Sequence, residues 1–81
     1  MPFFVYILKS DSLSHFYVGQ TDNLQKRLNE HNSGKSISTR YGRPWHIVYQ
    51  YTLPTRTLAV QLESKIKKRG IARFLSDSST P

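Results

Sequence analysis

One run of six apolar residues, Phe3–Leu8, limits the folds open to this chain more than any other feature of its sequence. The run is aromatic and β-branched, as strands prefer, and it is apolar at every position, which indicates a strand covered on both faces. It is shorter than the roughly 20 residues of a membrane span. It also lacks the basic start and the cleavage site of a signal peptide. We therefore expect a central strand in a soluble, cytoplasmic protein.

The residues after this run predict an antiparallel hairpin and then a helix. A polar turn at residues 10–14 precedes a second strand-like stretch at residues 15–19, as in a β-hairpin. The side chains of Thr21–Asn23 can cap a helix. Two leucines four residues apart share one face of that helix, which is expected to run to about His31.

The second half of the chain predicts a loop, a third strand and a second long helix. Residues 35–44 are polar and predict a loop that can include one helical turn, and residues 45–51 have strand composition. Thr55 or Thr57 opens the helix and Gly70 ends it. Its buried stripe is expected at four-residue spacing, on Leu58, Leu62 and Ile66. The order β-β-α-loop-β-α fits an α+β domain.

The length of the chain limits its organisation to one domain. A chain of 81 residues buries only about 60% of the surface that its unfolded form exposes, so a two-domain enzyme with its own cofactor-binding half is excluded. We expect the domain to occupy residues 1–75. The serine-rich stretch 76–81 has nothing to bury and is expected to be disordered.

Charge and cysteine content narrow the function classes. Twelve Lys and Arg against five Asp and Glu give a net charge of +7, which attracts polyanions. Nucleic acid is the favoured partner, and a merely basic soluble domain is the simpler alternative. A lipid surface is disfavoured because the apolar stripe of the second helix is needed for the core. The absence of cysteine excludes a disulfide framework and a thiol nucleophile, and the default oligomeric state is a monomer.

Several polar residues stand next to expected core positions and are candidates for chemistry. Tyr6 lies inside the apolar strand and Tyr17 on its hairpin partner, so their rings can lie close together. Arg27 and His31 are four residues apart on one helix and point the same way. Glu63 follows a leucine of the buried stripe and could hold Mg²⁺ with water and substrate phosphate. The simpler alternatives are two core tyrosines, solvated helix side chains, and an exposed ion pair between Glu63 and a lysine four residues later.

The sequence Phe4-Val5-Tyr6, followed after ten residues by Tyr17-Val18-Gly19, resembles the paired motif that names the GIY-YIG nuclease family. The resemblance continues, in the same order and at similar spacing, through Arg27, His31 and Glu63. It covers residues 3–69 and is closest to the small stand-alone bacterial members of the family. Segments similar to residues 39–44 and 63–68 recur in those members.

This resemblance implies both a fold and a reaction. The fold is a three-stranded antiparallel sheet flanked by helices, and the reaction is metal-dependent hydrolysis of a phosphodiester, usually in DNA. Glu63 would bind one Mg²⁺ or Mn²⁺ ion, Arg27 would contact the phosphate, and one motif tyrosine, Tyr6 or Tyr17, would be the general base. His31 matches a position that often holds His or Tyr in the site.

Two functions follow, depending on how the departures from the family pattern are weighed. Phe4 replaces the first glycine of the motif, and no asparagine follows Glu63, where many family nucleases have one. The first function is a metal-dependent DNA endonuclease of a structure-selective, repair-related type. The alternative is a nucleic-acid-binding module, for DNA or RNA, that has the same fold and little or no catalysis. In either case backbone phosphates would be contacted by a set of basic residues: Lys35, Arg40, Arg43, Lys65, Lys67, Lys68 and Arg69.

Overall fold

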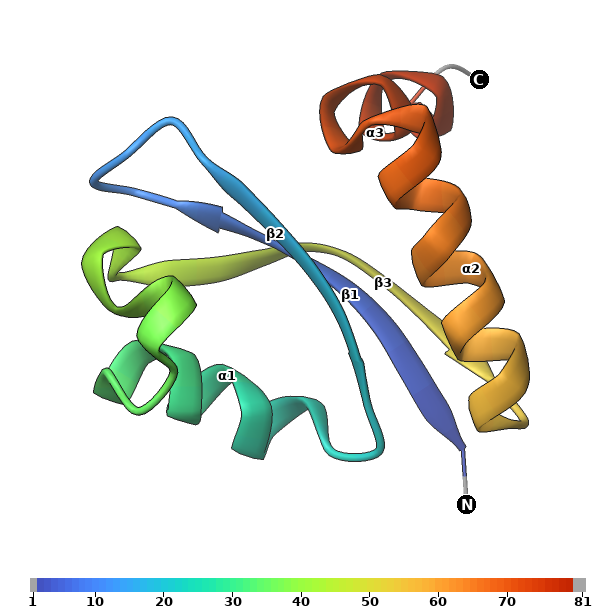
Figure 1. Cartoon of the computed structure of the whole chain (residues 1–81), viewed down its shortest axis with the longest axis horizontal. Coiled ribbons are helices and arrows are strands. Elements are labelled where there is room, and N and C mark those ends of the chain that lie inside the picture. Colours follow the sequence, from blue (N-terminus) through green and yellow to red (C-terminus); the bar gives the residue numbers. More distant parts are fainter. Residues whose placement is uncertain (1, 80–81) are drawn as a thin grey trace.

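Strand β1 (Phe3–Ser10) lies at the centre of an antiparallel sheet, between β2 (Phe16–Thr21) and β3 (Trp45–Leu53) (Figure 1). The computed structural model describes residues 2–79, and in it the four residues Val5–Leu8 are all buried. The predicted central strand, the hairpin with the second strand and the three-stranded antiparallel sheet of an α+β domain are therefore confirmed.

Helices cover both faces of the sheet, and their bounds are α1 (Leu24–Ser33), the 3-10 helix η1 (Ile37–Gly42), α2 (Arg56–Arg69) and α3 (Ile71–Ser79). Side chains alternate between the two faces along β1. Val5 and Ile7 pack in a core with α2 and α3, and Tyr6 and Leu8 pack in a second core with α1. Figure 1 shows α1 and η1 on one side of the sheet and α2 and α3 on the other.

The ends of the helices are fixed by the residues that the sequence singled out. Asn23 accepts a hydrogen bond from the backbone N–H of Lys26 at 3.1 Å, and Thr55 accepts one from that of Leu58 at 3.2 Å. Caps of this kind stabilise a helix by about 1 kcal/mol. Gly70 ends α2, as expected, with a φ of 95° that favours glycine. No helix within residues 2–79 has the length and apolar composition that a membrane crossing requires.

The predicted buried stripe of α2 is wrong at its first position. Leu58 is 41% exposed, whereas Ala59 is fully buried together with Ile66. Positions exactly four residues apart drift around a helix that has 3.6 residues per turn, so a stripe that stays on one face must include a three-residue step. The observed stripe, Ala59, Leu62 and Ile66, contains that step.

The prediction of a disordered tail from Ser76 is wrong for residues 76–79, which continue α3; residues 80–81 lie outside the described part. Phe74 packs edge-on against Tyr49 with ring centroids 5.1 Å apart, and so docks α3 on the sheet. Asp77 is bound by the Arg69 guanidinium through two hydrogen bonds of 2.8 and 3.2 Å. The serine-rich composition predicted disorder, whereas the contacts of Phe74 and Asp77 hold the helix against the rest of the domain.

Candidate active site

Two tyrosines and a histidine meet on the face of the sheet that α1 covers. Tyr6 comes from β1, Tyr17 from β2 and His31 from the last turn of α1. The ring centroids of Tyr6 and Tyr17 are 6.4 Å apart, and the His31 ring lies 4.8 Å from that of Tyr17. A buried hydrogen bond of 3.1 Å joins the Tyr6 hydroxyl to Nε2 of His31. The expectation that the two tyrosine rings lie near each other is confirmed.

Gly19 makes room for this cluster. It is paired with Tyr6 across the hairpin, and a Cβ atom on it would lie 2.6 Å from the Tyr6 hydroxyl oxygen and 3.2 Å from the Tyr17 ring. The first distance is far below van der Waals contact. Glycine is therefore required here because the Tyr6 ring lies over the strand, and not because of an unusual backbone angle.

Replacing Gly19 with alanine is expected to reduce the free energy of unfolding by about 1–3 kcal/mol, the usual range for overpacking a buried site. The new methyl group would push Tyr6 away from His31. Thermal unfolding should show a melting temperature lowered by roughly 4–8 °C for each kcal/mol. In a Tyr6→Phe background the clashing oxygen is gone, so the same substitution should be less damaging. An unchanged melting temperature for Gly19→Ala would mean that the Tyr6 ring does not lie over Gly19.

His31 is part of a hydrogen-bonded chain that reaches η1. Its Nδ1 lies 2.8 Å from the hydroxyl of Thr39, which is 1% exposed, and that hydroxyl donates to the Ser36 carbonyl at 3.5 Å. Burial lowers the pKa of His31, and the nearby Arg27 guanidinium lowers it further. We therefore assign a neutral imidazole that donates from Nδ1 to Thr39 and accepts the Tyr6 hydroxyl hydrogen at Nε2.

The buried neutral His31 should make the protein less stable in mild acid. Because its pKa is lowered on folding, the unfolded chain binds the proton more readily, so stability is greatest above the ordinary pKa near 6.5 and is lost as the pH falls below it. The loss is at most about 1.4 kcal/mol per pH unit for one proton. Urea unfolding at pH 7.5 and 5.5 measures it. In a His31→Gln variant the loss between these pH values should disappear, and equal wild-type stability at both would contradict the assignment.

Arg27 connects the tyrosines to the surface of α1. The hydroxyls of Tyr6 and Tyr17 help to raise the pKa of its guanidinium, which places Arg27 beside both tyrosines. It also donates to the Glu30 carboxylate at 3.0 Å, and this contact lowers the pKa of Glu30. An arginine held in this way presents a fixed cation beside the aromatic cluster.

The two tyrosines differ in accessibility. Tyr6 is 2% exposed, and burial raises its pKa to about 12 even though Arg27 acts in the opposite direction. Its hydroxyl is therefore protonated at neutral pH and held between Arg27 and His31. Tyr17 is only partly buried and lines an open hollow that also includes His15 and Trp45.

Glu63 stands on α2, the helix on the other side of the sheet, and still acts on the cluster. Its carboxylate is one of the groups that raise the pKa of Tyr6, which places it within electrostatic range of that hydroxyl. The side chain is 20% exposed and accepts an ion pair from Lys67 at 3.0 Å. The ion pair with Lys67 that the sequence offered as the simpler alternative is therefore present, and the role of Glu63 as a metal ligand stays a prediction.

Glu63 could supply one carboxylate to a hard divalent cation, but the described residues do not form a closed metal cage around it. Within residues 2–79 no three acidic or histidine side chains gather as a metal-binding group. Mg²⁺ is commonly held by one or two carboxylates, with water and substrate phosphate completing its shell. Glu63, whose side chain is partly exposed and paired with Lys67, can supply such a carboxylate.

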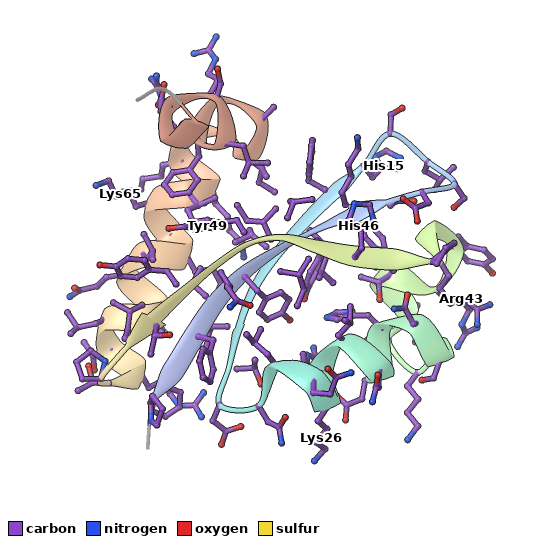
Figure 2. The ribbon with its side chains drawn as sticks, turned by 180° about the vertical axis from the view of Figure 1, so that it is seen from behind. His15, Lys26, Arg43, His46, Tyr49 and Lys65 are labelled. Carbon is purple, nitrogen blue, oxygen red and sulfur yellow. The ribbon has the colours of Figure 1, made fainter. Side chains whose placement is uncertain are left out.

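The basic residues fall into two groups rather than one continuous patch. Figure 2 shows Arg43 near η1 and Lys65 on α2 at opposite ends of the molecule. Near η1, Arg40 Nε donates to the Gly34 carbonyl at 3.2 Å and Arg43 Nε donates to the Arg40 carbonyl at 2.8 Å, which leaves the outer nitrogens of both guanidiniums exposed. Lys35, which precedes η1, is also exposed.

On α2, half of the predicted phosphate-binding group has an acidic partner. Lys67 is paired with Glu63 and Arg69 with Asp77. Lys65 and Lys68 line a shallow hollow together with Ser64. Exposed ion pairs contribute little free energy, about 0–1 kcal/mol, so they do not prevent these side chains from turning toward a polyanion.

Two residues of the segment 39–44 were given no individual role by sequence reasoning. Thr39 fixes His31, and its carbonyl also accepts a 2.7 Å hydrogen bond from Nε1 of Trp45. Tyr41 is 80% exposed although it is aromatic. Both lie in the segment that the sequence predicted as a polar loop, where no periodicity distinguishes a buried side chain from an exposed one.

Comparisons with known proteins match almost the whole chain. The family model of the GIY-YIG catalytic domain matches residues 2–73. A UPF0213 protein from Bacillus pumilus is 42% identical over 65 residues, which are 79% of this chain and 65% of that protein. A UPF0213 protein from Syntrophus aciditrophicus is 36% identical over 74 residues, 89% of this chain and 84% of that protein.

A solved structure supports the same relationship. The solution NMR structure of a UPF0213 protein from Bacillus halodurans superimposes with a TM-score of 0.60 at 28% sequence identity, covering 100% of this chain and 89% of that one. The family match extends from β1 into α3 and includes every residue of the tyrosine cluster together with Glu63. This chain is therefore a member of the GIY-YIG family, and the family resemblance read from its two motifs is confirmed.

Proposed function

We propose that this protein is a metal-dependent endonuclease that hydrolyses phosphodiester bonds in DNA. The observation that carries the proposal is the convergence of Tyr6, Tyr17, Arg27 and His31 in one cluster, in which Tyr6 and His31 are hydrogen-bonded, with the Glu63 carboxylate in electrostatic range. A tyrosine–arginine–carboxylate arrangement suits phosphoryl transfer, which depends on positioning and charge neutralisation. The net charge of +7 favours a polyanionic substrate.

Arg27 is the proposed phosphate ligand. Its guanidinium is always protonated and can hold two phosphate oxygens at once. Contact with Glu30 and with the two tyrosine hydroxyls fixes its position before substrate arrives. Glu63 would hold a divalent ion, and such an ion, when bound, neutralises the charge that develops on the leaving oxygen.

We assign the contact with the attacking water to Tyr17. In the reaction a P–O bond forms to that water and the ester P–O bond breaks, while the water gives up one proton and the leaving oxygen takes one from solvent. Tyr17 is the more accessible of the two tyrosines, so its phenol oxygen is the one that a water molecule can reach and that would take the proton. Tyr6, protonated and buried, positions Arg27 and His31.

The proposal is tested by cleavage of labelled DNA as plain duplex, nicked duplex, branched junction and single strand. Each reaction contains Mg²⁺, Mn²⁺ or EDTA. We expect cleavage of at least one substrate with either metal ion and none with EDTA. Cleavage that persists in EDTA would contradict metal dependence, and the preferred substrate would indicate whether the enzyme serves repair.

A nucleic-acid-binding module is the second candidate, favoured by the ion pair that occupies Glu63 and by the absence of an asparagine after it. For that function, DNA is bound and never cut. Binding through phosphate contacts weakens steeply with salt in both cases, so cleavage alone separates the two. No cutting of any substrate, together with salt-sensitive binding, would select the module.

A further inference from the structure

An exposed aromatic side chain stands beside the candidate active site. Tyr41 on η1 is 80% exposed, in a protein whose other described tyrosines at the site are buried or partly buried. It follows Arg40 directly and precedes Arg43 by two residues. An aromatic ring that stays exposed to water in the folded protein is available to pack against another flat group.

Tyr41 separates two hollows of different chemistry. One, of about 370 Å³, is lined by four aromatic residues, Phe16, Tyr17, Tyr41 and Trp45, together with Leu13, His15 and Gly42, and so leads from the candidate active site to Tyr41. The other, of about 460 Å³, is lined by Tyr41 together with Arg40 and Arg43. Both volumes fall in the range of small-ligand sites.

The two hollows together match the two halves of a nucleotide. An aromatic hollow accepts a nucleobase by stacking, and a pair of arginines accepts phosphate oxygens. The Nε atoms of Arg40 and Arg43 donate to backbone carbonyls, and both side chains are exposed on the rim of the second hollow. Two cations on the rim make a hydrophobic protein partner a poor occupant of the same surface.

A base can enter the aromatic hollow only if it is not stacked inside a duplex. A paired base has its faces covered by its neighbours, and exposing one requires either a single strand or an extruded nucleotide. We propose that Tyr41 is a stacking platform for the base of an unpaired DNA nucleotide next to the scissile phosphate, so that the substrate is a single strand or a duplex with an unpaired segment. This inference rests on the proposed DNA-cleaving function.

Binding in EDTA tests the platform separately from cleavage. Fluorescence anisotropy measures the Kd of wild type, Tyr41→Ala and Tyr41→Phe for a labelled single strand and for the blunt duplex of the same sequence. Loss of one stacked base weakens binding about 5-fold to 100-fold. We expect that loss for Tyr41→Ala on the single strand only, and near wild-type binding for Tyr41→Phe, which keeps the ring. Since Tyr41 is exposed, all variants should keep the wild-type melting temperature.

Three other outcomes would overturn the inference. Equal binding of wild type and Tyr41→Ala to both DNAs would remove Tyr41 from the interface and leave the proposed nuclease intact. Equal weakening on single strand and duplex would make Tyr41 a general backbone contact rather than a base platform. Failure of the wild type to bind any DNA, at low salt, would remove the proposed function and the platform together.

Discussion

Replacing Glu63 with glutamine is expected to reduce metal-dependent DNA cleavage about a thousandfold or more. Glutamine keeps the size of the side chain and removes the charge that would hold the divalent ion. A bound metal ion contributes several kcal/mol of transition-state stabilisation, and each 1.36 kcal/mol is a factor of ten in rate. The measurement is the single-turnover cleavage rate with saturating protein, so that weaker DNA binding does not enter the result.

Asp22→Asn is the matched control for this substitution. It changes the net charge by the same amount, and Asp22 is an exposed residue outside the tyrosine cluster. It should therefore cleave at the wild-type rate. Loss of the Lys67 ion pair in Glu63→Gln should cost little stability, because i,i+4 pairs at a helix surface contribute only about 0.3–0.5 kcal/mol. Wild-type cleavage by a folded Glu63→Gln protein would show that Glu63 does not hold the ion.

The parts of the fold that were predictable share a local cause. The apolar run Phe3–Leu8 exposes so much hydrophobic surface that it must become a covered strand. Gly70 ends α2 because the backbone there takes a positive φ, which glycine adopts without strain. Leu58 was placed wrongly because periodicity gives the face of a helix only to within one residue. The end of α3 was missed because the helix is held by contacts of Phe74 with Tyr49 and of Asp77 with Arg69. The serines that suggested disorder take no part in these two contacts.

The candidate site was predictable only through its motifs. The alternation of β1 and the hairpin register explain why Tyr6, Tyr17 and Gly19 share one face. Thr39 could not be found in this way, since it joins the cluster through a tertiary hydrogen bond from a segment without periodicity. The effect of the Glu63 carboxylate on the pKa of Tyr6, across the sheet, likewise depends on how α2 packs and cannot be found from sequence spacing.

The two motif tyrosines should respond differently to replacement by phenylalanine. Tyr17→Phe removes the proposed base, and general-base catalysis contributes about 10²–10⁴-fold, so cleavage should fall by that factor. Stability should change by less than about 0.5 kcal/mol, as for other accessible positions. Tyr6→Phe leaves Nε2 of the buried His31 without its partner. Its main effect should be a loss of about 1–3 kcal/mol of stability, the cost of an unsatisfied buried group.

The pH dependence of cleavage separates the two roles further. If Tyr17 takes the proton, the remaining Tyr17→Phe activity should lose the rise with pH that a tyrosine base gives, whereas Tyr6→Phe, measured where it is folded, should keep it. The pKa of Tyr6, raised to about 12 by burial, makes this hydroxyl the weaker candidate at neutral pH because its proton is the harder one to remove. The opposite pattern, with the pH-dependent rise kept in Tyr17→Phe and lost in Tyr6→Phe, would transfer the base to Tyr6. The neutral His31 that accepts its hydrogen bond would then be the group that receives the proton from it.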